Sequence, residues 1–310
     1  MISLPCLSYL PGAVKPAPYG MCGTTASFAA PQKLSPSYRS LTVPLRIKNL
    51  TEGSRVLPSF ILGGIFMEPI YKKTFEITDL VSDRFGKLKP SAVCYFVQEV
   101  AGQHFSHMAL TADLEHQNLF WAIIRHRVQI TRLPRRGENI TVETWPMPTT
   151  RVAYPRSVVA YDEKGQELFR SISLWVLMDK TSRAMVLPGK SGIAVRGILR
   201  GGELPRPNSL TPIVLSSEAN RRVCFTDLDV NGHMNNCRYL DWAADLLPSA
   251  FHENHTLTDV TMCYLAETRE GDALALSWEM GQEGTLRLDI HRCVEDKKER
   301  VFCADFHYAT

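Results

Sequence analysis

The pattern of apolar and polar residues predicts one helix followed by a series of strands in the first half of the chain. Residues 71–77 alternate as in a half-buried strand, and a run that opens at Pro90 repeats apolar residues at helical spacing. Alternating segments follow, separated by turn residues such as those at 163–166, which favours an antiparallel sheet. The strands expected after the helix are residues 120–130, 139–144, 157–162 and 167–178.

The same order of elements returns in the second half. Glycine and proline punctuate residues 188–215, as in a linker between two units. Beyond it we expect a strand at 221–225, a loop, a helix that ends near Leu247, and strands at 259–266, 273–280, 285–293 and 300–308. Two units with one order of elements imply an internal duplication. The predicted parts are a flexible extension at 1–66, a first unit at 67–187, a linker at 188–217 and a second unit at 218–310.

Both predicted helices are apolar on most of their faces. A helix that a curved antiparallel sheet wraps must bury most of its surface, whereas a helix on an open surface needs a single apolar stripe. The pattern therefore favours the α+β class, with a sheet around one helix in each unit. The positions expected in the core are Phe96, Val97, Val100, Ala101, Leu240, Ala243, Ala244 and Leu247.

Composition and charge narrow the class of protein. A chain of 310 residues, of which 45% are hydrophobic, can bury a substantial core. It contains no run of about 18 apolar residues, so no transmembrane helix is expected. The net charge of +3 arises in residues 1–66, which hold six Lys or Arg and one acid, and the rest of the chain carries −2. This balance argues against general nucleic-acid affinity, and no nucleic-acid-binding motif is visible.

The stretch 1–66 is poor in acids, rich in proline and serine, and without a sustained helical or alternating pattern. We expect a flexible extension there. Such a leader is similar to an organellar transit peptide. The alternative, which we favour, is a start assigned too early, with Met67 as the true first residue, as in a bacterial and cytoplasmic protein.

Cysteine and histidine spacing gives no metal site. The eight cysteines form no Cys-x-x-Cys pair, and most have apolar neighbours, so we expect reduced and buried thiols. The pairs His104/His107 and His252/His255 have i, i+3 spacing but no evident third ligand.

Candidate chemistry gathers in residues 226–240. Asp229, Asn231 and His233 stand at alternate positions just before an apolar-periodic run that begins at Met234. On an extended segment, alternate side chains point the same way, and the start of a helix offers free N–H groups to a carbonyl or an oxyanion. The alternative is a helix capped by Asn231 or Asp229, with His233 as a surface residue.

The longer string at 227–242 resembles the signature of the acyl-ACP thioesterases, hotdog-superfamily enzymes that release fatty acids from acyl carrier protein. Residues 119–125, 137–145 and 173–179 are similar to the first half of that family, and the resemblance runs from about Ile70 to the C-terminus. It implies a double hotdog, two tandem units in each of which a curved sheet wraps a helix. It also implies that the acid, amide and histidine of the motif belong to the active site, and that no cofactor is needed.

A second segment, 264–268, is similar to a family segment in which a glutamate is followed by a cysteine. Here Glu267 is followed by Thr268. The resemblance makes Glu267 the general-base candidate, and we expect burial to strengthen it as a base. The alternative is a solvated glutamate paired with Arg269. Thr268 without a strong adjacent base is a poor nucleophile, so we expect attack by water, with Thr268 at most accessory.

The roles implied for the motif follow from side-chain chemistry. Asn231 can donate to the thioester carbonyl or hold the water, and His233 can position that water or carry a proton to the departing sulfur. Asp229 is expected to orient both.

The partner implied is acyl carrier protein bearing a fatty acyl phosphopantetheine. Acyl carrier proteins are acidic, and residues 125–156 contain a cluster of arginines that can steer an acidic partner, although strand arginines also solvate exposed faces. The docking candidates are Arg132, Arg135 and Arg136. The acyl tail should occupy an apolar slot between helix and sheet of the first unit.

Several alternatives stay open at this stage. The chain is a cytoplasmic protein, or a plastid protein if 1–66 is a transit peptide, as in the plant members of the family. It acts as a monomer or a homodimer. The rival functions are an acyl-CoA thioesterase or another hotdog enzyme such as a dehydratase, and a non-catalytic acyl-binding sensor.

Overall fold

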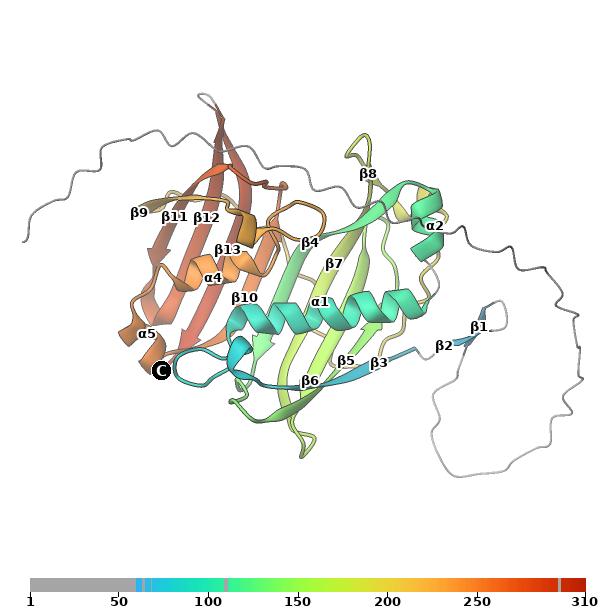
Figure 1. The fold of residues 1–310 in the computed structure, drawn as a ribbon, viewed down its shortest axis with the longest axis horizontal. Coiled ribbons are helices and arrows are strands. Elements are labelled where there is room, and N and C mark those ends of the chain that lie inside the picture. Colours follow the sequence, from blue (N-terminus) through green and yellow to red (C-terminus); the bar gives the residue numbers. More distant parts are fainter. Residues whose placement is uncertain (1–59, 63–64, 68, 109–110, 295–296) are drawn as a thin grey trace, which may run out of the picture. The chain divides into compact units, whose positions relative to one another are not determined.

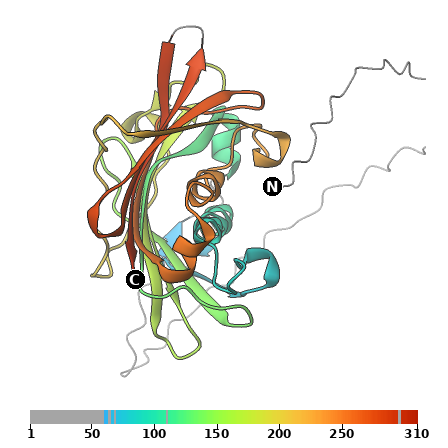
Figure 2. The same ribbon diagram turned by 90° about the vertical axis from the view of Figure 1, so that its left-hand side faces the viewer.

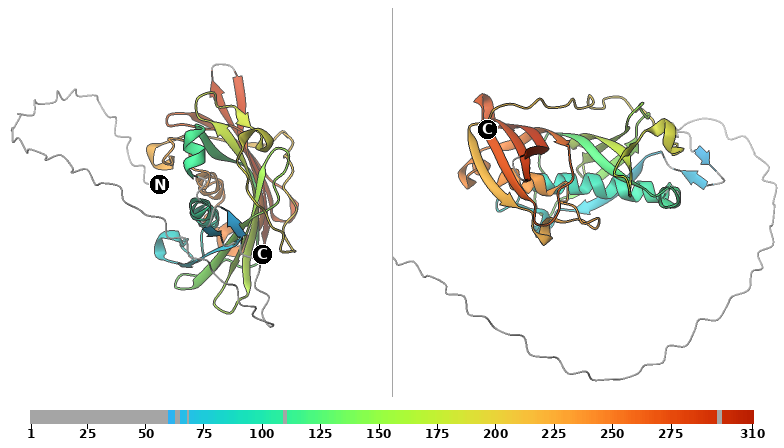
Figure 3. Two further views of the ribbon diagram at one scale, coloured as in Figure 1. Left: turned by 90° about the vertical axis from the view of Figure 1, so that its right-hand side faces the viewer. Right: turned by 90° about the horizontal axis from the view of Figure 1, so that it is seen from above.

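The computed structural model describes residues 60–62, 65–67, 69–108, 111–294 and 297–310. In this part of the chain, an eleven-stranded antiparallel sheet lies behind two helices, α1 and α4 (Figure 1). Figure 2 shows both helices end-on, side by side on one face of the sheet. The linker crosses the other face, where carbonyl oxygens of Pro207, Leu210 and Thr211 accept hydrogen bonds from arginines of the sheet (Figure 3).

The first half of the sheet has the strand order β3-β5-β6-β7-β4. Helix α1 (Pro90–His107) connects β3 to the rest, and a short strand β8 (Met185–Val186) pairs with the end of β7. The other bounds are β3 Tyr71–Glu76, β4 Leu119–Ile130, β5 Asn139–Pro146, β6 Tyr154–Tyr161 and β7 Glu167–Asp179. The predicted elements of this half are confirmed, with ends that move by a few residues.

The second half repeats this arrangement as β9-β11-β12-β13-β10. Helix α4 (Arg238–Ala244) lies between β9 and β10 in the sequence, as α1 lies between β3 and β4. The bounds are β9 Ser217–Arg222, β10 Thr256–Tyr264, β11 Ala273–Met280, β12 Thr285–Val294 and β13 Lys297–Ala309. The two halves therefore share one topology, as the duplicated sequence pattern predicts.

The halves join through β4 and β10, which pair antiparallel from Gln129↔Asp259 to Arg125↔Cys263. An ion pair between Arg127 Nη2 and Asp259 Oδ2, at 2.9 Å, crosses the same seam. The sheet is thus continuous across the duplication, with β3 and β9 at its two ends.

The helices bury the faces that the sequence predicts. Pro90 occupies the first turn of α1 after the extended residue Lys89, where a missing N–H costs nothing. The expected core positions are buried except Ala244, which is half-buried because it is the last residue of α4. Among the described residues, no helix has both the length and the apolarity that a membrane crossing requires.

The predicted helix at the end of the motif is shorter than expected. Helix α4 begins at Arg238 rather than near Met234, and a separate helix, α5 (Ser249–Asn254), begins after Pro248. The side chain of Asn235 accepts a hydrogen bond from the backbone N–H of Cys237 at 2.9 Å, a local contact that competes with helix formation. Proline then separates the two helices, since the residue before it avoids helical geometry.

Other short elements have weak sequence signals. Strand β9 covers Ser217–Arg222 instead of 221–225, because this edge strand is largely polar and lacks apolar alternation. Helices α2 (Thr111–His116) and α3 (Pro188–Ser191) were not predicted. Strands β1 (Phe60–Leu62) and β2 (Ile65–Met67) pair with each other, where no regular element was expected before residue 67. The prediction of a flexible extension otherwise concerns 1–59 and 63–64, which lie outside the described residues.

The described cysteines are free thiols, and four of the six are buried. Cys224 and Cys293 are exposed, contrary to expectation, because the first follows the edge strand β9 and the second lies near the end of β12. Cys6 and Cys22 lie outside the described residues.

One buried histidine predicts a pH dependence of stability. Burial on β4 lowers the pKa of His126 from its ordinary 6.5 to about 4. Between pH 4 and pH 6.5, the imidazole is mostly protonated in the unfolded chain and mostly neutral in the folded chain. The stability that neutral His126 contributes is therefore fully present above pH 6.5 and is lost as the pH falls toward 4. Between pH 7 and pH 5, we expect the free energy of unfolding measured in urea to fall by about 2 kcal/mol more in the wild type than in His126→Leu.

The matched control for this measurement is His307→Leu, which removes an exposed histidine of β13. It should lose stability on acidification as wild type does. If His126→Leu also behaves as wild type, His126 does not carry the pH dependence.

Candidate active site

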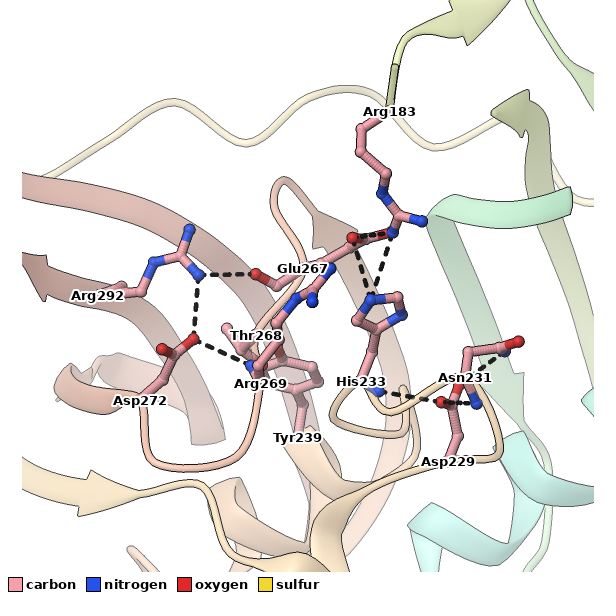
Figure 4. A network of polar contacts seen from close by, with 10 residues as sticks. All are labelled: Arg183, Asp229, Asn231, His233, Tyr239, Glu267, Thr268, Arg269, Asp272 and Arg292. Atoms are coloured by element: carbon pink, nitrogen blue, oxygen red, sulfur yellow. Dashed lines mark hydrogen bonds and ion pairs between the residues drawn. The ribbon is translucent and has the colours of Figure 1, made fainter. Parts of the chain in front are cut away.

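The predicted site residues gather at the seam between the two halves (Figure 4). A cavity of about 570 Å³ is lined there by the turn 229–233, by Glu267 just beyond β10, and by residues of the first half from α1, β4 and β7. The site is therefore built from both units.

Asp229 holds a tight turn rather than an extended segment. Its backbone N–H donates to His233 O at 2.7 Å, and the N–H of Gly232 donates back to Asp229 O at 3.0 Å. The carboxylate accepts from the N–H groups of Asn231 at 2.8 Å and His233 at 3.2 Å. Gly232 has a φ of +75°, which glycine adopts at no steric cost. The expectation of an extended segment is therefore wrong, although all three residues line the same cavity.

The consequence for Asn231 is that its amide points away from Glu267 in Figure 4 and contacts Asp229 Oδ2 at 3.3 Å. Helix α4 starts only at Arg238, so His233 does not sit at a helix N-terminus as the sequence pattern suggested.

The first half contains the same turn. Asp83 N donates to Lys87 O at 2.7 Å and Gly86 N to Asp83 O at 3.0 Å, while the Asp83 carboxylate accepts from the N–H groups of Phe85 and Lys87 at 2.8 and 2.9 Å. Each aspartate thus makes the same set of bonds. Asp229 is explained by the turn that it stabilises, and its counterpart Asp83 has no histidine beside it.

His233 and Glu267 meet directly. The Nε2 atom of His233 lies 3.3 Å from Glu267 Oε2, and their side chains are 13% and 34% exposed. The turn and the segment after β10 are held together by Met234 N, which donates to Thr268 O at 2.8 Å. Glu267 is less buried than expected, because it stands beyond the end of the strand.

Arg183 is a third member of this cluster, and no sequence pattern predicts it. Its guanidinium forms an ion pair with Glu267 and lies 3.3 Å from His233 Nε2. It sits in the turn between β7 and β8, where it has a φ of +57°, and its guanidinium stacks over Phe120. The residues from Asp179 onward signal a turn, but no sequence feature tells which residue across the seam that turn meets.

Glu267 is anchored through its backbone as well. Arg292 Nη1 donates to Glu267 O and to Asp272 Oδ2, both at 3.0 Å, and Asp272 also accepts from the N–H of Arg269. One alternative from the sequence paired Glu267 with Arg269. The structure instead pairs Glu267 with Arg183. The contacts of Arg292 and Asp272 with the backbone of Glu267 and Arg269 hold the loop that carries Glu267 (Figure 4).

Thr268 points into the protein. Its side chain is 1% exposed, and its hydroxyl lies 2.9 Å from the hydroxyl of Tyr239. Burial raises the pKa of Tyr239 to about 12, so this phenol stays protonated and does not serve as a base. No strong base therefore activates Thr268 at this contact.

A second, apolar cavity adjoins the first. It has a volume of about 420 Å³ and lies between α1 and the sheet of the first half, where the sequence predicts an acyl slot. The residues that line both cavities are Gln98, Trp121, Trp175 and Asn231. Arg156 lies at the slot and is buried, with 7% of its surface exposed. Burial lowers its pKa to about 10, and His104 and Thr144 contact its guanidinium at 3.1 Å.

Comparison with known protein families decides the affiliation. The sequence profile of the acyl-ACP thioesterase N-terminal domain matches residues 68–187, and that of the C-terminal domain matches residues 212–302. The chain belongs to the acyl-ACP thioesterase family. The resemblance seen in the sequence is thereby confirmed.

Characterised relatives agree with this assignment. The chloroplastic palmitoyl-acyl carrier protein thioesterase of Gossypium hirsutum is 29% identical over 68% of this chain and 55% of its own length. The chloroplastic dodecanoyl-[acyl-carrier-protein] hydrolase of Umbellularia californica is 25% identical over 66% of this chain and 58% of its own length. The chain thus spans about half the length of the curated relatives it matches.

Solved structures of the family share the fold. An acyl-ACP thioesterase from Bacteroides thetaiotaomicron superposes with a TM-score of 0.71, at 21% identity, over 78% of this chain and 98% of the other. The 12:0-ACP thioesterase of Umbellularia californica gives a TM-score of 0.67 at 20% identity, with the same coverage. The predicted α+β double hotdog is confirmed.

In this acyl-ACP thioesterase family member, the arginines expected to dock the carrier lie away from the site. Arg132 pairs with Glu138 at 2.8 Å and Arg136 with Asp79 at 2.9 Å. They lie just after the C-terminal end of β4, whereas residues 120–124, near the start of the strand, line the site. Along the strand, these site-lining residues are about 25 Å from that C-terminal end. Arg135 lies in the same loop, beside Lys87. Docking at these three arginines stays a prediction.

The repeated turn yields a stability prediction. We expect Asp229→Ala and Asp83→Ala each to lower the free energy of unfolding by about 1–2 kcal/mol, because each leaves two backbone N–H groups without their acceptor. Urea unfolding measures both. Glu253→Ala, an exposed carboxylate on α5, is the control and should change stability by less than about 0.5 kcal/mol. A loss in Asp83→Ala without one in Asp229→Ala would contradict a shared turn-stabilising role.

Proposed function

We propose that this protein hydrolyses the thioester of fatty acyl-acyl carrier protein and releases the free fatty acid. The observation that carries the proposal is the contact of Glu267 with His233 at 3.3 Å, in a cavity that shares lining residues with an apolar slot of the first half. A carboxylate and an imidazole beside such a slot suit water-mediated acyl transfer.

In the proposed mechanism, Glu267 takes a proton from water as the water oxygen attacks the thioester carbon. Collapse of the tetrahedral intermediate breaks the carbon–sulfur bond, and the proton passes by way of His233 to the departing thiolate. Water and thioester are thus converted to acid and thiol without an enzyme-bound acyl group. The buried contact of Thr268 with Tyr239 supports water rather than threonine as the nucleophile.

Arg183 is proposed as a positioning residue. Its ion pair with Glu267 and its 3.3 Å contact with His233 Nε2 fix both groups from the opposite half of the sheet. Its stacking over Phe120 in turn orients the guanidinium. Asp229 is proposed to act at one remove, by holding the turn that carries His233.

Stabilisation of the oxyanion needs N–H donors at the junction of the two cavities. Asn231 is the donor proposed from the sequence, and it lines both cavities. Gln98 Nε2 and Trp121 Nε1 line them too, are buried, and have no acceptor among the described residues. Unpaired buried donors are costly, so a ligand oxygen is a fitting acceptor for them.

The substrate class is proposed from the slot and the relatives together. The relatives are named for palmitoyl, dodecanoyl and oleoyl groups, which favours an acyl chain of medium to long length. The apolar slot between α1 and the sheet is the proposed seat of that chain.

The compartment is a proposal as well. The acid-poor leader and the chloroplastic relatives favour the plastid alternative over the cytoplasmic one. Residues 1–59, which would carry the targeting signal, lie outside the described residues.

The direct test is hydrolysis of acyl carrier protein thioesters of graded chain length by the wild type and by Glu267→Gln. We expect Glu267→Gln to lose about 10²–10⁴-fold in kcat, because it keeps the side-chain volume and removes the basic oxygen. Thr268→Ala, the neighbouring control, should stay within a few-fold of the wild type. Near-normal turnover by Glu267→Gln would refute the assignment, as would loss of activity confined to Thr268→Ala. Faster hydrolysis of acyl-CoA than of acyl-ACP would favour the rival acyl-CoA thioesterase.

A further inference from the structure

The turn that carries His233 has a counterpart in the first half, and the correspondence extends beyond the aspartates. Leu88 N donates to Pro134 O at 2.8 Å, as Met234 N donates to Thr268 O at 2.8 Å. A backbone bridge joins Lys87 to Arg135, as one joins His233 to Arg269. Matched by these bonds, Lys87 corresponds to His233, Phe85 to Asn231, and Leu133 to Glu267.

This second turn opens onto a cavity of its own, of about 610 Å³. The catalytic cavity is lined by the turn of one half together with the helix and the first residues of β4 from the other half. The second cavity is lined by the turn 83–87 with Leu133, by helix α4, and by Thr256 and Leu257 at the start of β10. The two cavities are therefore related by the same duplication that relates the two halves.

The second cavity lacks the groups of the proposed hydrolysis. Leu133 stands in place of the base, Phe85 in place of the amide, and Lys87 in place of the imidazole. A leucine cannot take a proton from water, so a thioester bound there would not be cleaved by this route.

The carboxylates that line this cavity are already engaged. Asp83 accepts from the backbone N–H groups of its turn. Asp241 pairs with Arg238 at 2.7 Å, and Asp245 pairs with Arg221 at 2.8 Å. Two of the three carboxylates are therefore paired with arginines, and Asp83 is held by backbone donors.

Arg238 pairs with Asp227 and Asp241, but three other basic side chains at the cavity meet neutral groups. Lys87 Nζ donates to Thr256 Oγ1 at 3.4 Å, and Lys89 Nζ donates to Leu80 O at 3.2 Å. The guanidinium of Arg84 lies over the ring of Phe85, 5.1 Å from its centroid. Two half-buried lysines and an exposed arginine thus line the cavity together with apolar residues. This combination suits a ligand with an anionic phosphate and an uncharged arm.

We propose that this second cavity binds a phosphopantetheine thioester arm without hydrolysing it, with the phosphate held by Arg84, Lys87 and Lys89. The class of ligand rests on the proposed function, because the catalytic cavity is proposed to take the same arm. The arm can come from an acyl carrier protein or from coenzyme A, and both share the phosphate that the basic residues recognise.

The test measures, by isothermal titration calorimetry on the full chain, the equilibrium binding of a thioether analogue of acyl-phosphopantetheine. This analogue cannot be hydrolysed. We expect two sites in the wild type and in Glu267→Gln. The double variant Lys87→Glu, Lys89→Glu should weaken one site about tenfold or more, because two attractive charges become repulsive. In the wild type, the analogue without its phosphate should bind that site about tenfold or more weakly than the phosphorylated analogue does. Separate titrations with acyl-ACP and acyl-CoA thioethers identify the source of the arm.

Hydrolysis assays on the same proteins separate this proposal from the proposed function. The lysine variant should keep the kcat of the wild type, since neither lysine lines the catalytic cavity. Two sites without any hydrolysis would uphold the second cavity and defeat the proposed function. A single site in the wild type, or two unaltered sites in the lysine variant, would overturn the second cavity. Lys87→Met with Lys89→Met, checked by its melting temperature, repeats the test without introducing like charges.

Discussion

The pairing of β4 with β10 is the constraint on which the rest of the structure depends. It joins two sheets of identical strand order into one, and the Arg127–Asp259 ion pair spans the same seam. Without this register, the turn that carries Arg183 would not reach Glu267, and the apolar slot of the first half would not open beside His233. Neither half holds the candidate site by itself, so the chemistry depends on the register of one strand pair.

The duplication explains which residues serve the fold and which serve the chemistry. An Asp-x-x-Gly turn occurs in both halves with matching hydrogen bonds, so the aspartate and glycine are accounted for by backbone geometry. His233 and Glu267 have Lys87 and Leu133 as counterparts, and they differ although their backbone settings agree. Two copies of one frame thus carry different side chains, which is how a single fold can hold unlike sites.

Apolar periodicity predicts the helices and strands whose residues are buried in a regular pattern. It misses polar elements and segments in which side-chain hydrogen bonds compete with regular backbone structure. Helix α1 and strands β4 to β7 follow from apolar periodicity, and Glu267 and His233 from the family resemblance. The polar edge strand β9 has no such alternation, and side-chain bonds of Asp229 and Asn235 override the extended and helical patterns around them. Arg183 was not predictable because its partner lies across the seam, and only the assembled sheet brings the two together.

In the proposed mechanism, water activated by Glu267 attacks the thioester carbon directly. The most direct test is a single turnover of acyl-ACP in ¹⁸O-labelled water, followed by mass spectrometry of the fatty acid and of the peptide that contains Glu267. We predict one ¹⁸O atom in the released acid, none in Glu267, and no acylated protein at any time point. Unlabelled fatty acid from the first turnover, or label in Glu267, would show that the carboxylate attacks the substrate itself and that water does not attack directly.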